Sequence, residues 1–171
     1  MHDLKDKGIG TQAIHGGHSK NAFGALATPI FQTSTFIFDS AEQGGKRFAL
    51  EEEGYIYSRL GNPTTSVIEE KIALLEHGEM AVATSSGMGA ISSTLWTLLK
   101  AGDHVIADTT LYGCTFALLN HGLTKFGIEV TFLNTGDIEA VKAAMRPNTR
   151  IVYLETPANP NLKITDIEAV A

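Results

Sequence analysis

Short apolar runs alternate with stretches of helical periodicity between residues 80 and 155. We expect strands at 80–84, 104–108, 129–133 and 150–155, separated by helices at 87–100, 112–126 and 137–145. Repeated strand–helix units favour a mainly parallel sheet covered by helices, because a parallel connection needs a long crossover. Ligands of such sheets bind at the carboxyl ends of the strands. The sequence therefore predicts an α/β fold with its site at that edge.

Residues 1–60 lack sustained periodicity and are rich in Gly, Thr, Ser and Phe. We interpret them as an extended N-terminal arm that packs on a neighbouring subunit, because its apolar residues have no evident core of their own. An irregular segment folded on its own domain is the alternative. A helix from Pro63 to about His77 follows, with Asn62 as its N-cap. Residues 61–171 are then the first part of the α/β domain.

Charge and composition exclude several classes of protein. Nineteen acidic residues face thirteen basic ones, and the lysines are scattered, which disfavours a nucleic-acid partner. No apolar run approaches the roughly 20 residues of a membrane-spanning helix, and the charged residues 1–7 do not resemble a signal peptide. The single cysteine, Cys114, fits a reducing compartment. We expect a soluble cytoplasmic protein.

The last residues, 166–171, begin a helix with an acidic first turn but carry no Gly, Asn or basic residue that would end it. We expect that the chain stops within a helix. A native terminal helix that frays at its end is the alternative.

A glycine turn is the strongest chemical feature. Residues 84–89 (TSSGMG) lie between an expected strand and an expected helix. Backbone N–H groups at a helix start favour an anion, and glycines allow close approach to it. The turn is therefore a candidate phosphate-binding loop. A tight turn without a ligand is the alternative.

A dinucleotide site is a rival interpretation of the same loop. Gly87 and Gly89 begin a Gly-x-Gly-x-x-Gly pattern, and Asp108 follows the next strand about where a ribose-binding acid would stand. The third glycine is replaced by Ser92, so an NAD-dependent dehydrogenase is a distant alternative. His15 and His18 have no third and fourth partner nearby, and we expect no metal.

Four separated segments point to one family. They are residues 55–64 (YIYSRLGNPT), 85–90 (SSGMGA), 111–115 (LYGCT) and 155–160 (ETPANP). In this order and spacing they resemble the cystathionine and methionine γ-lyase family of pyridoxal phosphate (PLP) enzymes. The resemblance extends from Thr11 to Ala171 and implies the large domain of the fold type I PLP-dependent transferases, incomplete here.

The resemblance assigns cofactor-binding residues in two places. Tyr57, Ser58 and Arg59 match arm residues that bind PLP. Of these, Tyr57 and Arg59 would reach the cofactor phosphate in the neighbouring subunit. An always-charged arginine suits that dianion. A dimer would then be the smallest catalytic unit, within a homotetramer. Ser86, Gly87 and Met88 match the loop that binds the phosphate in the same subunit.

The resemblance also implies roles near the ring and the substrate. Tyr112 matches a tyrosine that stacks on the cofactor ring and is a candidate acid for the departing thiol. Cys114 would lie at the substrate side and tune specificity, although a lone cysteine is by default a small buried hydrophobe. Asn159 matches a residue that hydrogen-bonds the ring hydroxyl; otherwise it belongs to a turn.

The dipeptide Gly113-Cys114 resembles the methionine-cleaving branch of the family. That branch converts L-methionine to methanethiol, 2-oxobutanoate and ammonia by α,γ-elimination. Cystathionine γ-lyase, homoserine-ester sulfhydrylase and a noncatalytic assembly fragment are the alternatives.

The family's Schiff-base lysine, in a Ser-x-Thr-Lys pattern after a strand, has no match in this sequence. The most similar segment, Leu123-Thr124-Lys125, lies at the end of a predicted helix and lacks the serine of the pattern. The acid that pairs with the pyridine nitrogen is also missing. We therefore expect the 171 residues to be inactive on their own.

Overall fold

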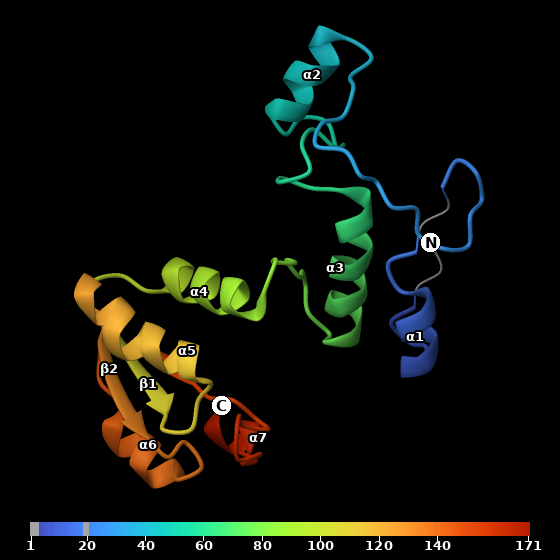
Figure 1. The fold of residues 1–171 in the computed structure, drawn as a ribbon. Coiled ribbons are helices and arrows are strands. Elements are labelled where there is room, and N and C mark those ends of the chain that lie inside the picture. The colour runs from blue at the N-terminus through green and yellow to red at the C-terminus, as the bar shows by residue number, and fades with distance from the viewer. Residues whose placement is uncertain (1–3, 19–20) are drawn as a thin grey trace. The chain divides into compact units, whose positions relative to one another are not determined.

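A computed structural model describes residues 4–18 and 21–171 of the chain (Figure 1). Two short ranges, 1–3 and 19–20, lie outside the described residues. Both belong to the predicted arm, and residues 1–3 also belong to the segment compared with a signal peptide. The chain divides into two compact units, with the division between Ala83 and Thr84. The predicted domain boundary at residue 60 falls inside the first unit. Across the described residues, no helix is long and apolar enough to cross a membrane.

The described residues of unit 1 form the helices α1 (Ile9–His15), α2 (Ala41–Phe48) and α3 (Pro63–Leu75). Helix α3 confirms the prediction, since the Asn62 side chain accepts a hydrogen bond from the Thr64 N–H at the start of the helix. Helices α1 and α2 lie within the segment that we interpreted as an arm without sustained periodicity. With seven and eight residues, these helices are too short to show a clear apolar period.

The segment before α3 folds back on itself. Thr35 and Tyr57 form an antiparallel bridge, and the Phe36 N–H donates to the Ile56 carbonyl at 3.1 Å. The Phe36 ring also contacts the Tyr55 ring, with 5.4 Å between their centroids. These contacts give residues 55–59 a defined backbone path before α3 begins.

Unit 2 is built on a parallel three-stranded sheet in the order β2-β1-β3. Its strands are β1 (His104–Asp108), β2 (Glu129–Leu133) and β3 (Thr149–Tyr153), and its helices are α4 (Gly87–Leu98), α5 (Gly113–Ala117), α6 (Ile138–Ala144) and α7 (Ile167–Val170). These three strands and the helices at the α4 and α6 positions confirm the predictions within a few residues. All five residues of β1 are buried, as its central place requires.

The strand predicted at 80–84 is absent, and that prediction was wrong. A strand needs a neighbouring strand for its backbone hydrogen bonds, and none in the described part of the chain pairs with this segment. Instead the Ala83 N–H donates to the Glu69 carboxylate at 2.8 Å. Met80 and Val82 are 80% and 75% exposed.

The helix predicted at 112–126 is present but irregular. After α5 the chain continues as a π-helical turn (Leu118–Gly122) and a 3-10 turn (Leu123–Phe126). Apolar spacing identifies a helix but does not distinguish these closely related backbone patterns.

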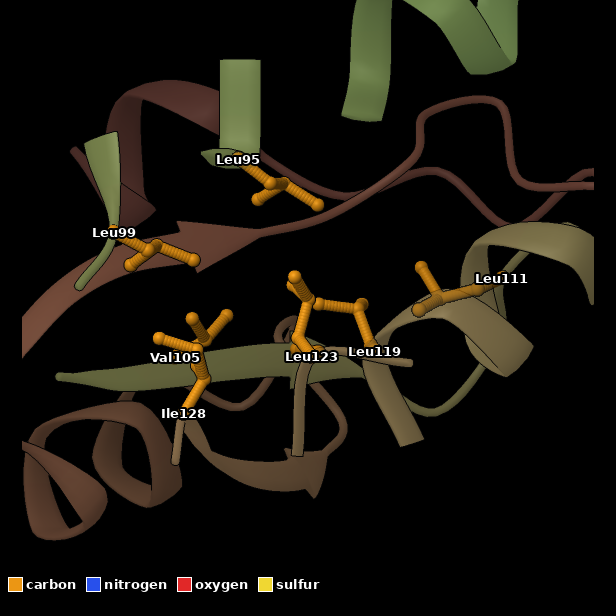
Figure 2. Packing of buried hydrophobic residues seen from close by; sticks show 8 residues of the cluster. Leu95, Leu99, Val105, Leu111, Leu119, Leu123 and Ile128 are labelled. Carbon is orange, nitrogen blue, oxygen red and sulfur yellow. The ribbon is translucent and has the colours of Figure 1, made fainter. Parts of the chain in front are cut away.

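The core of unit 2 lies between β1 and two helical segments. Leu95 of α4 and Leu99 just after it, together with Leu119 and Leu123 after α5, pack with Val105 of β1 (Figure 2). Burying each such side chain contributes roughly 1.5–3 kcal/mol relative to exposure. This packing holds α4 and the α5 segment against one strand, so that the residues at the starts of both helices have fixed positions.

His104, the first residue of β1, contacts both neighbouring strands. Its Nδ1 lies 2.8 Å from the Thr149 hydroxyl of β3, and its Nε2 lies 2.9 Å from the Thr131 hydroxyl of β2. Burial lowers the pKa of His104, and the charge of Arg146 lowers it further. The neutral ring therefore joins all three strands and supports their register.

Candidate functional site

The start of α4 carries the predicted phosphate loop. The Ser86 hydroxyl accepts a hydrogen bond from the Gly89 N–H at 3.0 Å and caps the helix. The N–H groups of Gly87 and Met88 in the first turn have no acceptor within the helix. Ser86 and Gly87 are exposed, and a Cβ added to Gly87 would meet no atom within 4 Å. An anion therefore has open access to these N–H groups.

Replacing Ser86 by alanine is expected to lower the free energy of unfolding by about 1 kcal/mol, because the cap is lost. Urea unfolding measures the change. Ser93→Ala is the matched control, since Ser93 is exposed in the middle of α4 and its replacement should alter stability by less than about 0.5 kcal/mol. Equal effects of the two variants would contradict the capping role.

Tyr112 occupies the N-cap position of α5, just beyond the carboxyl end of β1. Its backbone N–H donates to Glu155 Oε2 at 2.9 Å, and its side chain is 44% exposed. Three residues on, the buried Thr115 hydroxyl donates to the Met88 sulfur at 3.7 Å. The helix that carries Tyr112 is thus joined to the start of α4.

The two predicted catalytic residues, Tyr112 and Cys114, both stand at the start of α5, two residues apart. Hydrogen bonding with Cys114, followed by a charge interaction with the same residue, raises the pKa of the Tyr112 hydroxyl above its usual value. The hydroxyl is therefore protonated at neutral pH, which is the form that donates a proton. Cys114 is exposed, so the default interpretation of a buried hydrophobe was wrong.

Asn159 lies in the turn that follows β3. The neighbouring Ala158 is 1% exposed, and its N–H donates to the Lys163 carbonyl at 2.9 Å, which closes the turn. Asn159 itself is exposed. Because β1 and β3 are parallel neighbours, Tyr112 and Asn159 follow strands that end at the same edge of the sheet.

The three predicted arm residues belong to unit 1. The Arg59 guanidinium carbon lies 5.3 Å from the centroid of the Tyr57 ring, and both side chains are exposed. The Ser58 hydroxyl donates to the Thr33 carbonyl and accepts from the Asn62 side chain at 2.8 Å. Ser58 thus supports the backbone of the arm, while Tyr57 and Arg59 are open to a partner.

Asp108 has an internal role that the sequence did not predict. It is 1% exposed and accepts hydrogen bonds from the Thr110 N–H at 2.7 Å and from Lys163 Nζ at 2.7 Å, besides the Thr135 N–H and hydroxyl. Burial alone would raise the pKa of Asp108, but the hydrogen bonds from Lys163, Thr135 and Thr110 outweigh burial and lower it. Such a carboxylate is not presented to a ribose, which disfavours the dinucleotide alternative.

Sequence reasoning also missed Glu155 and Lys163 as individual site residues. Their partners Tyr112 and Asp108 lie 43 and 55 residues away along the chain, and no local pattern links them. Among residues 4–18 and 21–171, no group of three or more His, Cys, Asp or Glu side chains is arranged to hold a metal ion.

Comparisons with known proteins identify the family of the chain. The model of the family described as "Cys/Met metabolism PLP-dependent enzyme" matches residues 10–171. The L-methionine gamma-lyase of Fusobacterium nucleatum subsp. nucleatum is 72% identical over 169 residues, which are 99% of this chain and 43% of that protein.

Solved structures share the fold. The structure of metB from Corynebacterium glutamicum is 38% identical with a TM-score of 0.89, over 98% of this chain and 42% of that one. Cystathionine gamma-lyase from Lactobacillus plantarum, complexed with L-serine, is 44% identical with a TM-score of 0.84, over 95% and 40%. The likeness confirms the predicted type I PLP-dependent transferase fold.

The chain spans less than half the length of these relatives. Within that span, the family match covers nearly every residue, and it includes all four segments on which the resemblance was based. The chain belongs to the family of Cys/Met metabolism PLP-dependent enzymes.

Proposed function

We propose that the protein carrying this chain is a PLP-dependent carbon–sulfur lyase that cleaves L-methionine into methanethiol, 2-oxobutanoate and ammonia. The observation that carries the proposal is the position of Tyr112 and Cys114 at the start of α5, a helix that the Thr115–Met88 contact joins to the capped start of α4. The high identity with the L-methionine gamma-lyase of Fusobacterium nucleatum supports the choice of substrate.

The residues present fit PLP. The open space beside Gly87 leaves the N–H groups of Gly87 and Met88 accessible to a phosphate, and the Ser86 hydroxyl stands at the same turn. The partly exposed Tyr112 ring offers a stacking surface, and the exposed Asn159 amide would hydrogen-bond the ring hydroxyl. When bound, PLP supplies an electron sink for reactions at the substrate's carbon atoms.

Tyr112 would act as the general acid of this reaction. A tyrosine hydroxyl, with an ordinary pKa of about 10, is protonated at neutral pH, so that a proton is available for the sulfur atom that leaves the substrate. Cys114, next to that hydroxyl, would contact the substrate side chain and influence which thiol is released. Cystathionine γ-lyase and homoserine-ester sulfhydrylase activities are the alternatives within the family.

The arm would complete the site of a second copy. Tyr57 and Arg59 are exposed and would reach the cofactor phosphate of a neighbouring subunit, with Ser58 supporting their backbone. Unit 1 also exposes large apolar residues that an interface would cover, among them Phe23, Leu26 and Ile37 at 93%, 88% and 93%. A dimer would be the catalytic unit of a homotetramer, and the reduced Cys114 fits a cytoplasmic location.

Product analysis tests the proposal. A family-length protein carrying this sequence is incubated with L-methionine and, separately, with cystathionine. We expect methanethiol and 2-oxobutanoate in equal amounts from L-methionine, at a higher kcat/KM than for cystathionine. The 171-residue chain alone is the control and should release no methanethiol. A family-length protein that cleaves cystathionine but releases no methanethiol would exclude the proposed substrate.

A further inference from the structure

Glu155 connects the end of β3 to the start of α5. It is half-buried and lies two residues beyond the last residue of β3. Its Oε2 accepts the Tyr112 backbone N–H at 2.9 Å, and its Oε1 accepts the Tyr153 hydroxyl at 3.4 Å. One carboxylate thus contacts both the N-cap of α5 and a residue of the central sheet.

Tyr153, the sheet residue in this connection, is held in place by its packing. Tyr153 packs against the core cluster, and burial raises the pKa of its hydroxyl, with the charge of Glu155 adding to the rise. The hydroxyl also interacts with Thr115, the residue whose own hydroxyl reaches Met88. Contacts therefore run without a break from Tyr112 through Glu155, Tyr153 and Thr115 to the start of α4.

We propose that Glu155 is a positioning residue that sets the orientation of Tyr112, an inference that rests on the proposed function of Tyr112. The N–H of an N-cap residue has no acceptor within its helix, and Glu155 supplies one with a full charge. The negative charge also suits the amino end of α5. Without this acceptor the Tyr112 peptide would be free to turn, and the ring and hydroxyl would leave their place beside Cys114.

Three replacements at one position separate the hydrogen bond from the charge. Glu155→Ala removes the acceptor, and Glu155→Asp withdraws it by one methylene, which provides a second test if the alanine variant folds poorly. We expect kcat for methanethiol release to fall about tenfold in Glu155→Ala, with KM changed less than about twofold. Glu155→Gln keeps an amide oxygen for the Tyr112 N–H and should stay within about threefold of the wild type. Glu139→Gln, which alters an exposed carboxylate on α6, is the matched control.

A double variant tests whether Glu155 acts through Tyr112. In a Tyr112→Phe background, Glu155→Ala should lower kcat by less than about threefold, because the hydroxyl that it positions is already gone. A full tenfold loss in both backgrounds would show that Glu155 acts independently of Tyr112 and would overturn the proposal.

A readout without substrate separates this proposal from the proposed function. The rate of Cys114 alkylation, followed by peptide mass spectrometry, reports the contact between Cys114 and the Tyr112 hydroxyl. We expect the rate to change about threefold or more in Glu155→Ala and to return to the wild-type value in Glu155→Gln. Failure of the proposed function would appear as no methanethiol from the wild type, whatever the alkylation rates. Equal alkylation rates in the wild type and Glu155→Ala would reject the positioning role even if the wild type is active.

Discussion

A Tyr112→Phe variant of the family-length protein is expected to lose about a hundredfold or more in kcat for methanethiol release, within the usual contribution of general acid catalysis. The variant keeps the ring that would stack on the cofactor and removes only the hydroxyl beside Cys114. Because the pKa of that hydroxyl is raised above about 10, the wild type holds the proton throughout the neutral range. Steady-state kinetics with L-methionine measure the loss, and the cofactor's absorbance should show unchanged PLP binding.

Tyr55→Phe is the matched control for this experiment. The Tyr55 hydroxyl bonds to Ser66 at 3.3 Å within unit 1, so its removal should leave kcat within about twofold. If Tyr112→Phe were as active as Tyr55→Phe, another group would have to protonate the departing sulfur, and the assignment of the acid would be wrong.

Replacing Lys163 by methionine is expected to lower the free energy of unfolding by about 3–5 kcal/mol, because removing one partner leaves a buried charge uncompensated. Lys163 Nζ lies 2.7 Å from Asp108 Oδ2 and 2.5 Å from Asn134 Oδ1. The side chains of Lys163 and Asp108 are 23% and 2% exposed, so water does not replace the lost contact. Urea unfolding at neutral pH measures the change.

The effect of Lys163→Met should depend on pH. Asp108 has a lowered pKa in the folded protein, so its contribution is fully present above the unfolded value of about 3.9 and is lost as pH falls through the folded value. The stability difference between wild type and variant should therefore be largest at neutral pH and shrink in acid. Lys142→Met, which removes an exposed ion pair with Glu139, is the control and should cost less than about 1 kcal/mol. An equal loss in both variants would contradict the role of the buried pair.

Local patterns determined much of unit 2. The apolar runs of β1 and β2 are bounded by turns and were predicted to the residue, because strand length and apolar spacing are local properties. The same holds for Asn62, whose side chain caps its own helix. The family followed from four short segments, and it brought Tyr112 and Cys114 forward as site residues. Tyr112 and Cys114 are neighbours because both stand at the start of the same helix, α5.

Pairing between distant segments was decided by the tertiary structure. The residues at 80–84 have the composition of a strand, yet no neighbouring strand pairs with them in the described part of the chain. The order β2-β1-β3 puts the ends of β1 and β3 side by side, and only this arrangement brings Glu155 to Tyr112 and Lys163 to Asp108. Sequence by itself determined the strands β1, β2 and β3, the helix that Asn62 caps, and the family to which the chain belongs. Tertiary structure decided which distant charges meet, because spacing along a chain carries no information about which strand lies next to which.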